Sequence, residues 1–220
     1  MYSSTGGSLD PLQVRVLGLL AGLEPRWTLT GGGALGIRCG YRSTRDLDLF
    51  WHGLSTLDSL PELVRSRLEA AGLSVERIQS SPAFVRLQAS DSSQARLIID
   101  LVASPIETAS EPQELELAGH VLLVDTEHEI LANKLGALLS RSELRDLWDV
   151  MELVDRGGDL ERALDDAAKK DGGFSQLTLA WLLEQFDVEA IAELTPLEGD
   201  LVERLIRFKA RLSERLTSQP

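Results

Sequence analysis

The sequence predicts an α+β fold, in which a mixed β-sheet flanked by helices is followed by a helical C-terminal region. Segments that alternate in polarity and carry β-branched residues lie before Asp125, whereas almost everything from Thr126 onward has helical periodicity. A length of 220 residues with 43% hydrophobic side chains suffices for one catalytic-sized domain and a compact second one. We therefore expect a flexible tail over 1–10, a sheet domain over 11–125 and a helical domain over 126–220.

The sheet domain is expected to begin with a helix and a strand that ends at a run of three glycines. A short helix closed by Gly40 and a second, half-buried strand follow this glycine turn. The expected helices are 11–23, 34–39 and 57–71, and the expected strands are 27–29, 46–51, 74–78, 83–88, 96–102, 114–117 and 121–124.

Helical periodicity dominates the C-terminal region, with breaks at the paired glycines 157–158 and 172–173. The expected helices are 127–139, 142–154, 160–169, 174–186 and 197–216.

The formal net charge of −13 and the pI near 4.7 argue against a protein that coats nucleic acid electrostatically. Any contact with a polynucleotide must therefore be local. No stretch approaches the roughly 18 consecutive apolar residues that a membrane helix needs, and the N-terminal residues lack a basic signal region. We expect a cytoplasmic protein without a membrane partner.

Two carboxylates, Asp46 and Asp48, lie two residues apart in an expected strand with Leu47 and Leu49 between and after them. Successive strand side chains alternate between faces, so both carboxylates point to one side. There they can share a pair of divalent cations about 3.5–4 Å apart, the arrangement that assists in-line phosphoryl transfer.

The glycine turn, Gly31, Gly32 and Gly33, stands directly before the next expected helix and follows Thr30. Glycine allows backbone N–H groups to approach phosphate oxygens closely, and a helix N-terminus favours an anion. A glycine turn is often only a turn, and an Asp-X-Asp pair is often only solvated. Their order and spacing together favour a phosphate held beside its metal.

A third carboxylate, Asp100, lies inside the apolar expected strand 96–102. An unpaired buried carboxylate is costly, so a role next to the metal or as the general base is plausible. The alternative is an ordinary residue near the end of a strand.

A second block of charged residues follows in the helical region. Lys134, Arg141 and Arg145 recur at intervals of seven and four and can share a helix face, provided that the helix does not break near Ser140. Such a face could reach phosphates, with Asp146 and Asp149 orienting its cations. The same spacing also fits a ladder of ion pairs on a helix surface.

These blocks together resemble the polymerase-β nucleotidyltransferase superfamily, whose signature is a glycine-rich turn, a strand-borne Asp-X-Asp and a later third Asp. More narrowly, the sequence is similar to the AbiEii/AbiGii toxin family. The similarity covers about 27–151 and is carried by four segments in order: 31–35, 42–50, 134–138 with Arg141, and 145–149.

The resemblance implies a polymerase-β-like fold and a type IV toxin that uses a nucleoside triphosphate and Mg²⁺. Relatives that modify transfer RNA ends imply an RNA acceptor, and a cognate antitoxin is an implied partner. By motif position, Asp46 and Asp48 would bind metal, Arg42 would lie near phosphate, and Lys134 would contact the triphosphate. Asp146 or Asp149 would be the essential late acid.

One position departs from this family pattern. Gly33 stands where these enzymes usually place Ser or Thr to hydrogen-bond a phosphate. Thr30 or backbone N–H groups would have to replace that hydroxyl, whose loss costs roughly 1.5–3 kcal/mol.

Near the C-terminus, arginines recur beside an apolar helical stripe formed by Leu201, Leu205, Phe208 and Leu212. This basic edge can meet an RNA backbone or an acidic antitoxin, or it can be the solvated flank of an amphipathic helix. The arginines are Arg204, Arg207, Arg211 and Arg215.

Two alternatives to an RNA-modifying enzyme stay open. The same fold class modifies small hydroxylated molecules and proteins, and an acidic enzyme suits a cationic acceptor. A non-catalytic module that binds a nucleotide or an antitoxin is the other alternative, with Gly33 as a sign of a decayed site.

Overall fold

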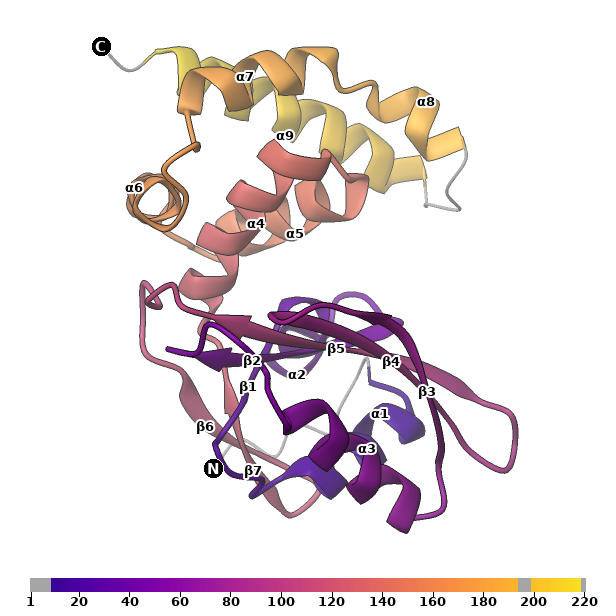
Figure 1. The fold of residues 1–220 in the computed structure, drawn as a ribbon. Helices are drawn as coiled ribbons and strands as arrows, with labels where there is room; N and C mark the ends of the chain where they lie inside the picture. Colours follow the sequence, from indigo (N-terminus) through magenta and orange to yellow (C-terminus); the bar gives the residue numbers. More distant parts are fainter. Residues whose placement is uncertain (1–8, 194–198, 219–220) are drawn as a thin grey trace. The chain divides into compact units, whose positions relative to one another are not determined.

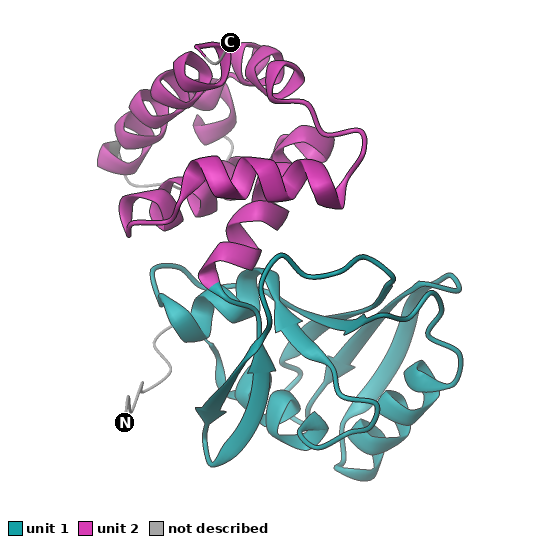
Figure 2. Ribbon diagram, turned by 90° about the vertical axis from the view of Figure 1, so that its left-hand side faces the viewer, with its two compact units in different colours: residues 1–126 teal, residues 127–220 magenta. Residues whose placement is uncertain are grey.

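The computed structural model describes residues 9–193 and 199–218 of the chain. The chain divides into two compact units, residues 1–126 and 127–220, which are coloured separately in Figure 2. The expected tail over 1–10 lies outside the described residues, apart from Leu9 and Asp10. In the described part of the chain, no helix has both the length and the apolar character to cross a bilayer.

Unit 1 is built on one mixed sheet that, in its described residues, has seven strands in the order β3-β4-β5-β2-β1-β7-β6. Strand β2 is parallel to β5 and antiparallel to β1, and β1 is parallel to β7. The strands are β1 (Thr28–Thr30), β2 (Asp46–His52), β3 (Ser74–Ser80), β4 (Phe84–Ser90), β5 (Arg96–Ser104), β6 (Gln113–Leu117) and β7 (His120–Val124). The predicted mixed sheet is confirmed.

The helices of unit 1 cover the apolar face of this sheet. Helices α1 (Pro11–Leu20) and α3 (Leu60–Ala70) lie together beneath it in Figure 1. Helix α2 (Gly31–Arg38) packs against β1 and β2. Their buried leucines and valines meet the inward side chains of the central strands, which include Leu47, Leu49, Leu87, Ile99 and Leu101. The opposite face of the central strands is left for polar side chains.

Two helix boundaries differ from the sequence prediction for identifiable reasons. Helix α1 ends at Leu20 because Gly22, with a φ of +69°, turns the chain away. Helix α3 begins at Leu60, three residues later than predicted, since Asp58 takes a φ of +45° that is incompatible with a helix.

Unit 2 is helical throughout its described residues. The helices are α4 (Glu127–Arg141), α5 (Leu144–Asp155), α6 (Leu160–Lys170), α7 (Gln176–Gln185), α8 (Val188–Glu193) and α9 (Gly199–Thr217). Helix α9 packs against α5, α7 and α8, and its predicted apolar stripe is buried. The short α8 was not predicted, and residues 197–198 of the predicted last helix lie outside the described residues.

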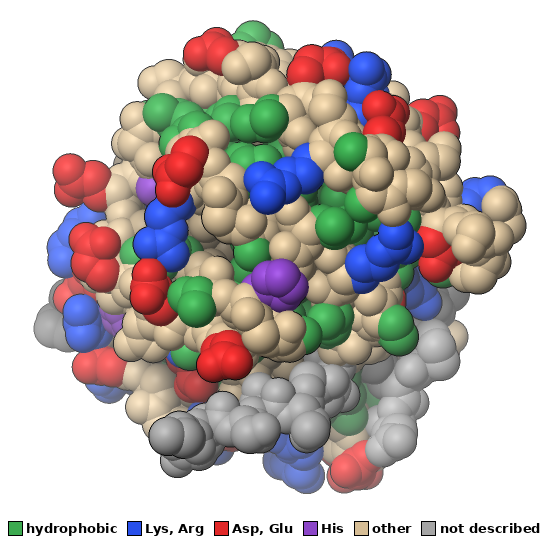
Figure 3. Space-filling view, turned by 90° about the horizontal axis from the view of Figure 1, so that it is seen from below, with side chains coloured by type: hydrophobic (Ala, Val, Ile, Leu, Met, Phe, Trp, Pro, Cys, Tyr) green, Lys and Arg blue, Asp and Glu red, His purple; other side chains and the backbone are tan. Residues whose placement is uncertain are grey.

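One face of the molecule, drawn in Figure 3, shows acidic and basic side chains interspersed among apolar ones. The basic side chains visible there stand singly, so this face carries no concentrated positive patch among the coloured residues.

Candidate active site

The predicted Asp-X-Asp pair lies on the open face of β2. Asp46 and Asp48 are half-buried, whereas Leu47, Leu49 and Trp51 between and after them are buried in the core. This alternation confirms that both carboxylates share one face, and the leucines anchor the strand beneath them.

The third predicted carboxylate is next to this pair. In the parallel β2–β5 ladder Asp100 is in register with Asp48, so both side chains leave the sheet on the same face. In the antiparallel β1–β2 ladder Thr30 is in register with Asp48 on its other side. The sheet therefore gathers all three predicted carboxylates and Thr30 at one place.

Arg86 of β4 completes this row, and the sequence analysis did not identify it. Arg86 is in register with Asp100 and binds its carboxylate in a bidentate manner. The Nε atom donates to Asp100 Oδ1 at 2.7 Å, and the Nη2 atom donates to Oδ2 at 2.6 Å. The hydrogen bond with Asp100 raises the pKa of Arg86, and the charges of Asp100, Asp46 and Asp48 add to this effect against an opposing contribution of burial.

Asp46 and Asp48 therefore lie together on this face, and the third carboxylate, Asp100, is held by an arginine. Among the described residues, no three or more His, Cys, Asp or Glu side chains gather closely enough to hold a metal ion. A pair of carboxylates nevertheless suits Mg²⁺, which usually takes one or two protein carboxylates and completes its shell with substrate phosphates and water.

The glycine turn lies directly against the carboxylates. Gly31 has a φ of +60°, and a Cβ atom on it would lie 2.3 Å from Asp48 Oδ2. A side chain at position 31 would therefore be strained and would collide with the carboxylate. The first turn of α2 can approach Asp48 so closely because it has no side chain there.

Thr44 fills the corresponding space at Gly32. A Cβ atom on Gly32 would lie 2.5 Å from Thr44 Oγ1 and 3.6 Å from an Nη2 atom of Arg42. Thr44 Oγ1 donates a hydrogen bond of 2.6 Å to Asp46 Oδ1. The structure thus places Arg42 beside the glycine turn, and it adds Thr44, which the sequence analysis did not identify.

Gly33 faces the core instead. A Cβ atom on it would lie 3.0 Å from Leu29 Cδ1 and 3.1 Å from Leu47 Cδ2. The departure from the usual Ser or Thr therefore lies at the contact between α2 and the sheet. Thr30 precedes α2 without capping it through its side chain, so its hydroxyl does not occupy the N–H groups of the first turn.

The predicted residues of the helical region form a second cluster, within unit 2. Lys134 Nζ lies 2.7 Å from Asp146 Oδ1 and 2.6 Å from Asp149 Oδ2, and both aspartates are fully buried. Arg141 donates to both oxygens of Asp146, with Nε at 2.7 Å and Nη2 at 2.8 Å. Burial opposes ionisation, but the hydrogen bonds and charges of Arg141 and Lys134 outweigh it and lower the pKa of Asp146.

A shared helix face for Lys134, Arg141 and Arg145 required an unbroken helix, and the helix breaks before Arg145. Helix α4 ends at Arg141 because Ser142 takes a φ of +49°, and Arg145 belongs to the next helix. Its Nη2 atom lies 3.3 Å from Glu143 Oε2 at the surface. Lys134 and Arg141 do act together, through their common partner Asp146.

The sequence comparison decides the family. A model of the "Nucleotidyl transferase AbiEii toxin, Type IV TA system" family matches residues 16–214, which is most of the chain. This chain belongs to the AbiEii nucleotidyltransferase toxin family. It is therefore a nucleotidyltransferase, as the resemblance implied. Among curated proteins, the sequence has no match.

Solved structures support the AbiEii assignment at the level of the fold. The nucleotidyltransferase toxin MenT4 of Mycobacterium tuberculosis is 16% identical, with a TM-score of 0.60 over 95% of this chain and 82% of its own. JHP933 of Helicobacter pylori is 18% identical, with a TM-score of 0.54 over 96% of each chain. An antigenic nucleotidyltransferase-like protein of Paracoccidioides brasiliensis is 17% identical, with a TM-score of 0.51 over 88% of this chain and 92% of its own. The predicted polymerase-β-like fold is confirmed.

Proposed function

We propose that this AbiEii-family enzyme transfers a nucleoside monophosphate from a nucleoside triphosphate to a hydroxyl of RNA, at the 3′ end of transfer RNA, in a Mg²⁺-dependent reaction. The observation that supports this most directly is the close approach of the glycine turn to Asp48. Asp46 lies on the same face of β2 as Asp48. Phosphate-binding backbone and metal-binding carboxylates are thereby within reach of one triphosphate.

The carboxylates Asp46 and Asp48 would hold the metal. When bound, Mg²⁺ would neutralise charge on the triphosphate and polarise its reacting phosphorus, in a two-metal arrangement if Asp100 also takes part. Thr44 keeps Asp46 in a fixed orientation through its hydroxyl, and Leu47 keeps the strand anchored in the core.

Residues Gly31 to Gly33 and Arg42 would bind the phosphates. The first turn of α2 lies against Asp48, and its N–H groups have no side-chain cap from Thr30. Thr30 and the arginine supply a further hydroxyl and a positive charge at the same turn.

Asp100 stays the predicted general base or third metal ligand. Both of its oxygens accept hydrogen bonds from Arg86, so either role requires Arg86 to release at least one of them. As a base, Asp100 would take the proton of the acceptor hydroxyl.

For unit 2 we keep the assignments that the family motifs imply. Lys134 would contact the triphosphate together with Arg141 and Arg145, and Asp146 or Asp149 would be the essential late acid. The support from the structure is that two buried aspartates hold the Lys134 ammonium group in one position. Such a group is pre-oriented for a phosphate that approaches it.

The toxin function implies a cognate antitoxin and action in the cytoplasm, where transfer RNA is found. The net charge of the chain, −13, argues against an extended RNA-binding surface. A small hydroxylated molecule or a basic protein is therefore the alternative acceptor.

The test is incubation of the purified protein with labelled nucleoside triphosphates, Mg²⁺ and total RNA. We expect label in transfer RNA and none with Asp48→Asn. Glu76→Gln is the matched control, because it removes one negative charge from an exposed position of the same sheet. Label in protein or in a small molecule would replace RNA as the acceptor. Triphosphate binding without transfer to any acceptor would instead support a non-catalytic module.

A further inference from the structure

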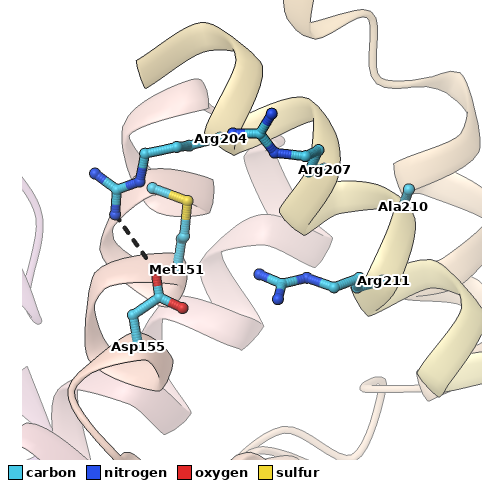
Figure 4. Close-up of a pocket in the computed structure, with 6 residues that line it drawn as sticks. All are labelled: Met151, Asp155, Arg204, Arg207, Ala210 and Arg211. Atoms are coloured by element: carbon cyan, nitrogen blue, oxygen red, sulfur yellow. Dashed lines mark hydrogen bonds and ion pairs between the residues drawn. The ribbon is translucent and has the colours of Figure 1, made fainter. Parts of the chain in front are cut away.

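A pocket of about 500 Å³ opens between helices α5 and α9 of unit 2. Figure 4 shows the side chains of Arg204, Arg207 and Arg211 projecting from α9 around Met151 of α5. These arginines stand at helical intervals of three and four, so they share one face of α9. Ala210 lies between them and leaves the wall open, and Asp155 is the acidic residue of the lining.

One of these arginines is part of the framework. Arg204 Nη2 lies 2.8 Å from Glu152 Oε1 and 3.3 Å from Asp155 Oδ2, both on α5. These contacts tie α9 to α5 and also neutralise the acidic residue of the lining. The pocket is therefore held in shape by Arg204.

The other two arginines are available to a ligand. Arg207 is 67% exposed, and its Nη1 atom lies 3.6 Å from Glu203 of its own helix. Arg211 lies over the ring of Phe208 at 5.8 Å, and among the described residues no carboxylate lies within 4.0 Å of it. A guanidinium group supported on an aromatic ring keeps its hydrogen-bond donors free for an anion.

The charge of this helix contrasts with that of the chain. Helix α9 carries five basic and three acidic residues, although the chain as a whole has a net charge of −13. The arginines of this helix attract an anion locally, against the repulsion of the negatively charged chain as a whole. Phosphate suits such a site, because the planar fork of an arginine binds its oxygens in pairs.

We propose that the α5–α9 pocket binds the phosphate backbone of the RNA acceptor through Arg207 and Arg211. This rests on the RNA acceptor of the proposed function. Two guanidinium groups four residues apart on a helix are spaced to engage neighbouring phosphates of one strand. The pocket supplies the local contact that an acidic enzyme needs to retain a polynucleotide.

The experiment measures binding of bulk transfer RNA to the full chain carrying Asp48→Asn, which prevents transfer, over a series of salt concentrations. In this background Arg207→Gln with Arg211→Gln should weaken binding roughly 25- to 60-fold near 0.1 M salt, if each arginine neutralises one phosphate. The slope of log K against log salt should fall in magnitude by about 1.4 to 1.8. The control is Arg156→Gln with Arg162→Gln, the same charge change on exposed side chains of unit 2.

An unchanged affinity and slope in the pocket variant would overturn the proposal, as would an equal loss in the control. If the pocket variant binds RNA normally but loses an acidic protein partner, the pocket serves that partner instead. Transfer of label to RNA by the protein without these substitutions is measured separately. If no label is transferred to RNA, the proposed acceptor is wrong. If label is transferred but the pocket variant binds RNA normally, only the proposal for the pocket is wrong.

An independent observation concerns Thr44, whose hydroxyl donates to Asp46. Thr44 is buried, and its carbonyl oxygen accepts a hydrogen bond of 3.0 Å from Nε2 of Gln13. Gln13 is fully buried in α1, and its Oε1 atom accepts from the backbone N–H of Asp10 at 2.8 Å. Both ends of this buried amide are thus satisfied by backbone groups, and the segment before β2 is fixed to α1.

We infer that Thr44 is a positioning residue. Its hydroxyl, which lies next to Gly32, orients the Asp46 carboxylate for the metal. The hydrogen bond of 2.6 Å to Asp46 Oδ1 fixes one carboxylate oxygen and so restricts the rotation of the group. The Thr44 hydroxyl fits in this place only because position 32 is a glycine. A side chain at position 32 would occupy the same volume as the hydroxyl.

The test is Mn²⁺ affinity, measured by the paramagnetic resonance of free Mn²⁺. Thr44→Val keeps the shape and removes the donor, and we expect it to weaken Mn²⁺ binding about 10- to 100-fold, the usual effect of losing an outer-shell partner. Thr44→Ser should restore affinity to within a few-fold. Thr44→Ala serves as the second test if the valine variant does not fold. A folded variant without the hydroxyl that binds Mn²⁺ as tightly as the unsubstituted protein would overturn this role.

Discussion

The two units each contain a pair of aspartates, and the pairs have opposite environments. Asp146 and Asp149 of α5 are fully buried and share the Lys134 ammonium group, with Arg141 as a further partner of Asp146. Asp46 and Asp48 of β2 are half-buried, and Arg86 on the same face is bound to Asp100. One pair is neutralised inside the protein, and the other lies half-buried beside a glycine turn.

This difference separates two uses of a carboxylate. A buried and compensated pair fixes the positions of its helices, and breaking it leaves an uncompensated charge. A half-buried pair beside a glycine turn can exchange its contacts for a cation from solution. The catalytic role predicted for Asp146 or Asp149 would be exerted through the orientation of Lys134.

The largest expected effect is on the stability of unit 2. Asp146→Asn leaves Lys134 and Arg141 without their shared charge, so we expect it to lower the free energy of unfolding by about 3–5 kcal/mol. Asp155→Asn is the control on the same helix, because its ion pair with Arg204 is exposed and should contribute at most about 1 kcal/mol. Urea unfolding measures both. Equal losses would remove the distinction between the buried and the exposed pair.

For the pair in unit 1 we expect the opposite result. Asp46→Asn should change the free energy of unfolding by no more than about 1 kcal/mol, because the amide oxygen of asparagine can still accept the hydrogen bond from Thr44. Nucleotidyl transfer should fall more than about 100-fold, because loss of a direct metal ligand exceeds the 10- to 100-fold effect of an outer-shell change. A variant that unfolds readily but retains transfer would reverse our comparison.

The glycine turn offers a smaller and sharper test. Gly31→Ala and Gly22→Ala both place a Cβ atom at positive φ, of +60° and +69°, which costs about 1–2 kcal/mol. At Gly22 nothing lies within 4 Å of the new atom, whereas at Gly31 it meets Asp48. Thermal unfolding should therefore show a loss in both variants, and Mn²⁺ affinity should fall in Gly31→Ala alone.

Acid should affect the buried pair in a defined direction. The lowered pKa of Asp146 means that its ionised form stabilises the fold above the unfolded-state pKa of about 3.9, and this contribution is lost as the pH falls through the folded-state value. The stability difference between the unsubstituted protein and Asp146→Asn should thus be constant above about pH 5 and shrink below about pH 4. Chemical unfolding at a series of pH values measures it. A difference that grows in acid would contradict this assignment.

The smallest expected change is at Arg86. Arg86→Gln removes a positive charge next to three carboxylates, so Mn²⁺ affinity should rise roughly tenfold, the effect of one unit charge on a divalent ion about 6 Å away with water-like screening. Arg96→Gln, at the exposed start of β5, is the control for net charge. Weaker Mn²⁺ binding in Arg86→Gln would show that this arginine supports the metal site instead of competing for Asp100.

Sequence periodicity was sufficient to place the carboxylates of unit 1. The alternation in 46–51 put Asp46 and Asp48 on one face, and the apolar run around Asp100 indicated a neighbouring strand; both expectations are confirmed by the ladder register. Arg86 could not be found in this way, because its contact with Asp100 depends on which strands pair and in which register. The same holds for Gln13, which meets Thr44 from a helix 31 residues earlier.

The helical region was predictable in outline but not at its breaks. The expected helices 127–139 and 142–154 already separated Arg145 from Lys134, but the boundary itself was misplaced by two residues, because Ser142 has a positive φ that its residue type does not announce. Helix α8 is six residues long, which is too short for a helical period to stand out.

The position of Gly33 has a consequence for protein engineering. Its missing Cβ atom points at Leu29 and Leu47, so the contact between α2 and the sheet is already full at this residue. Reinstating the family's customary hydroxyl there requires the ends of these two leucines to give way by a few tenths of an ångström. Serine combined with a smaller residue in place of one leucine would make room for the new Cβ atom without that adjustment.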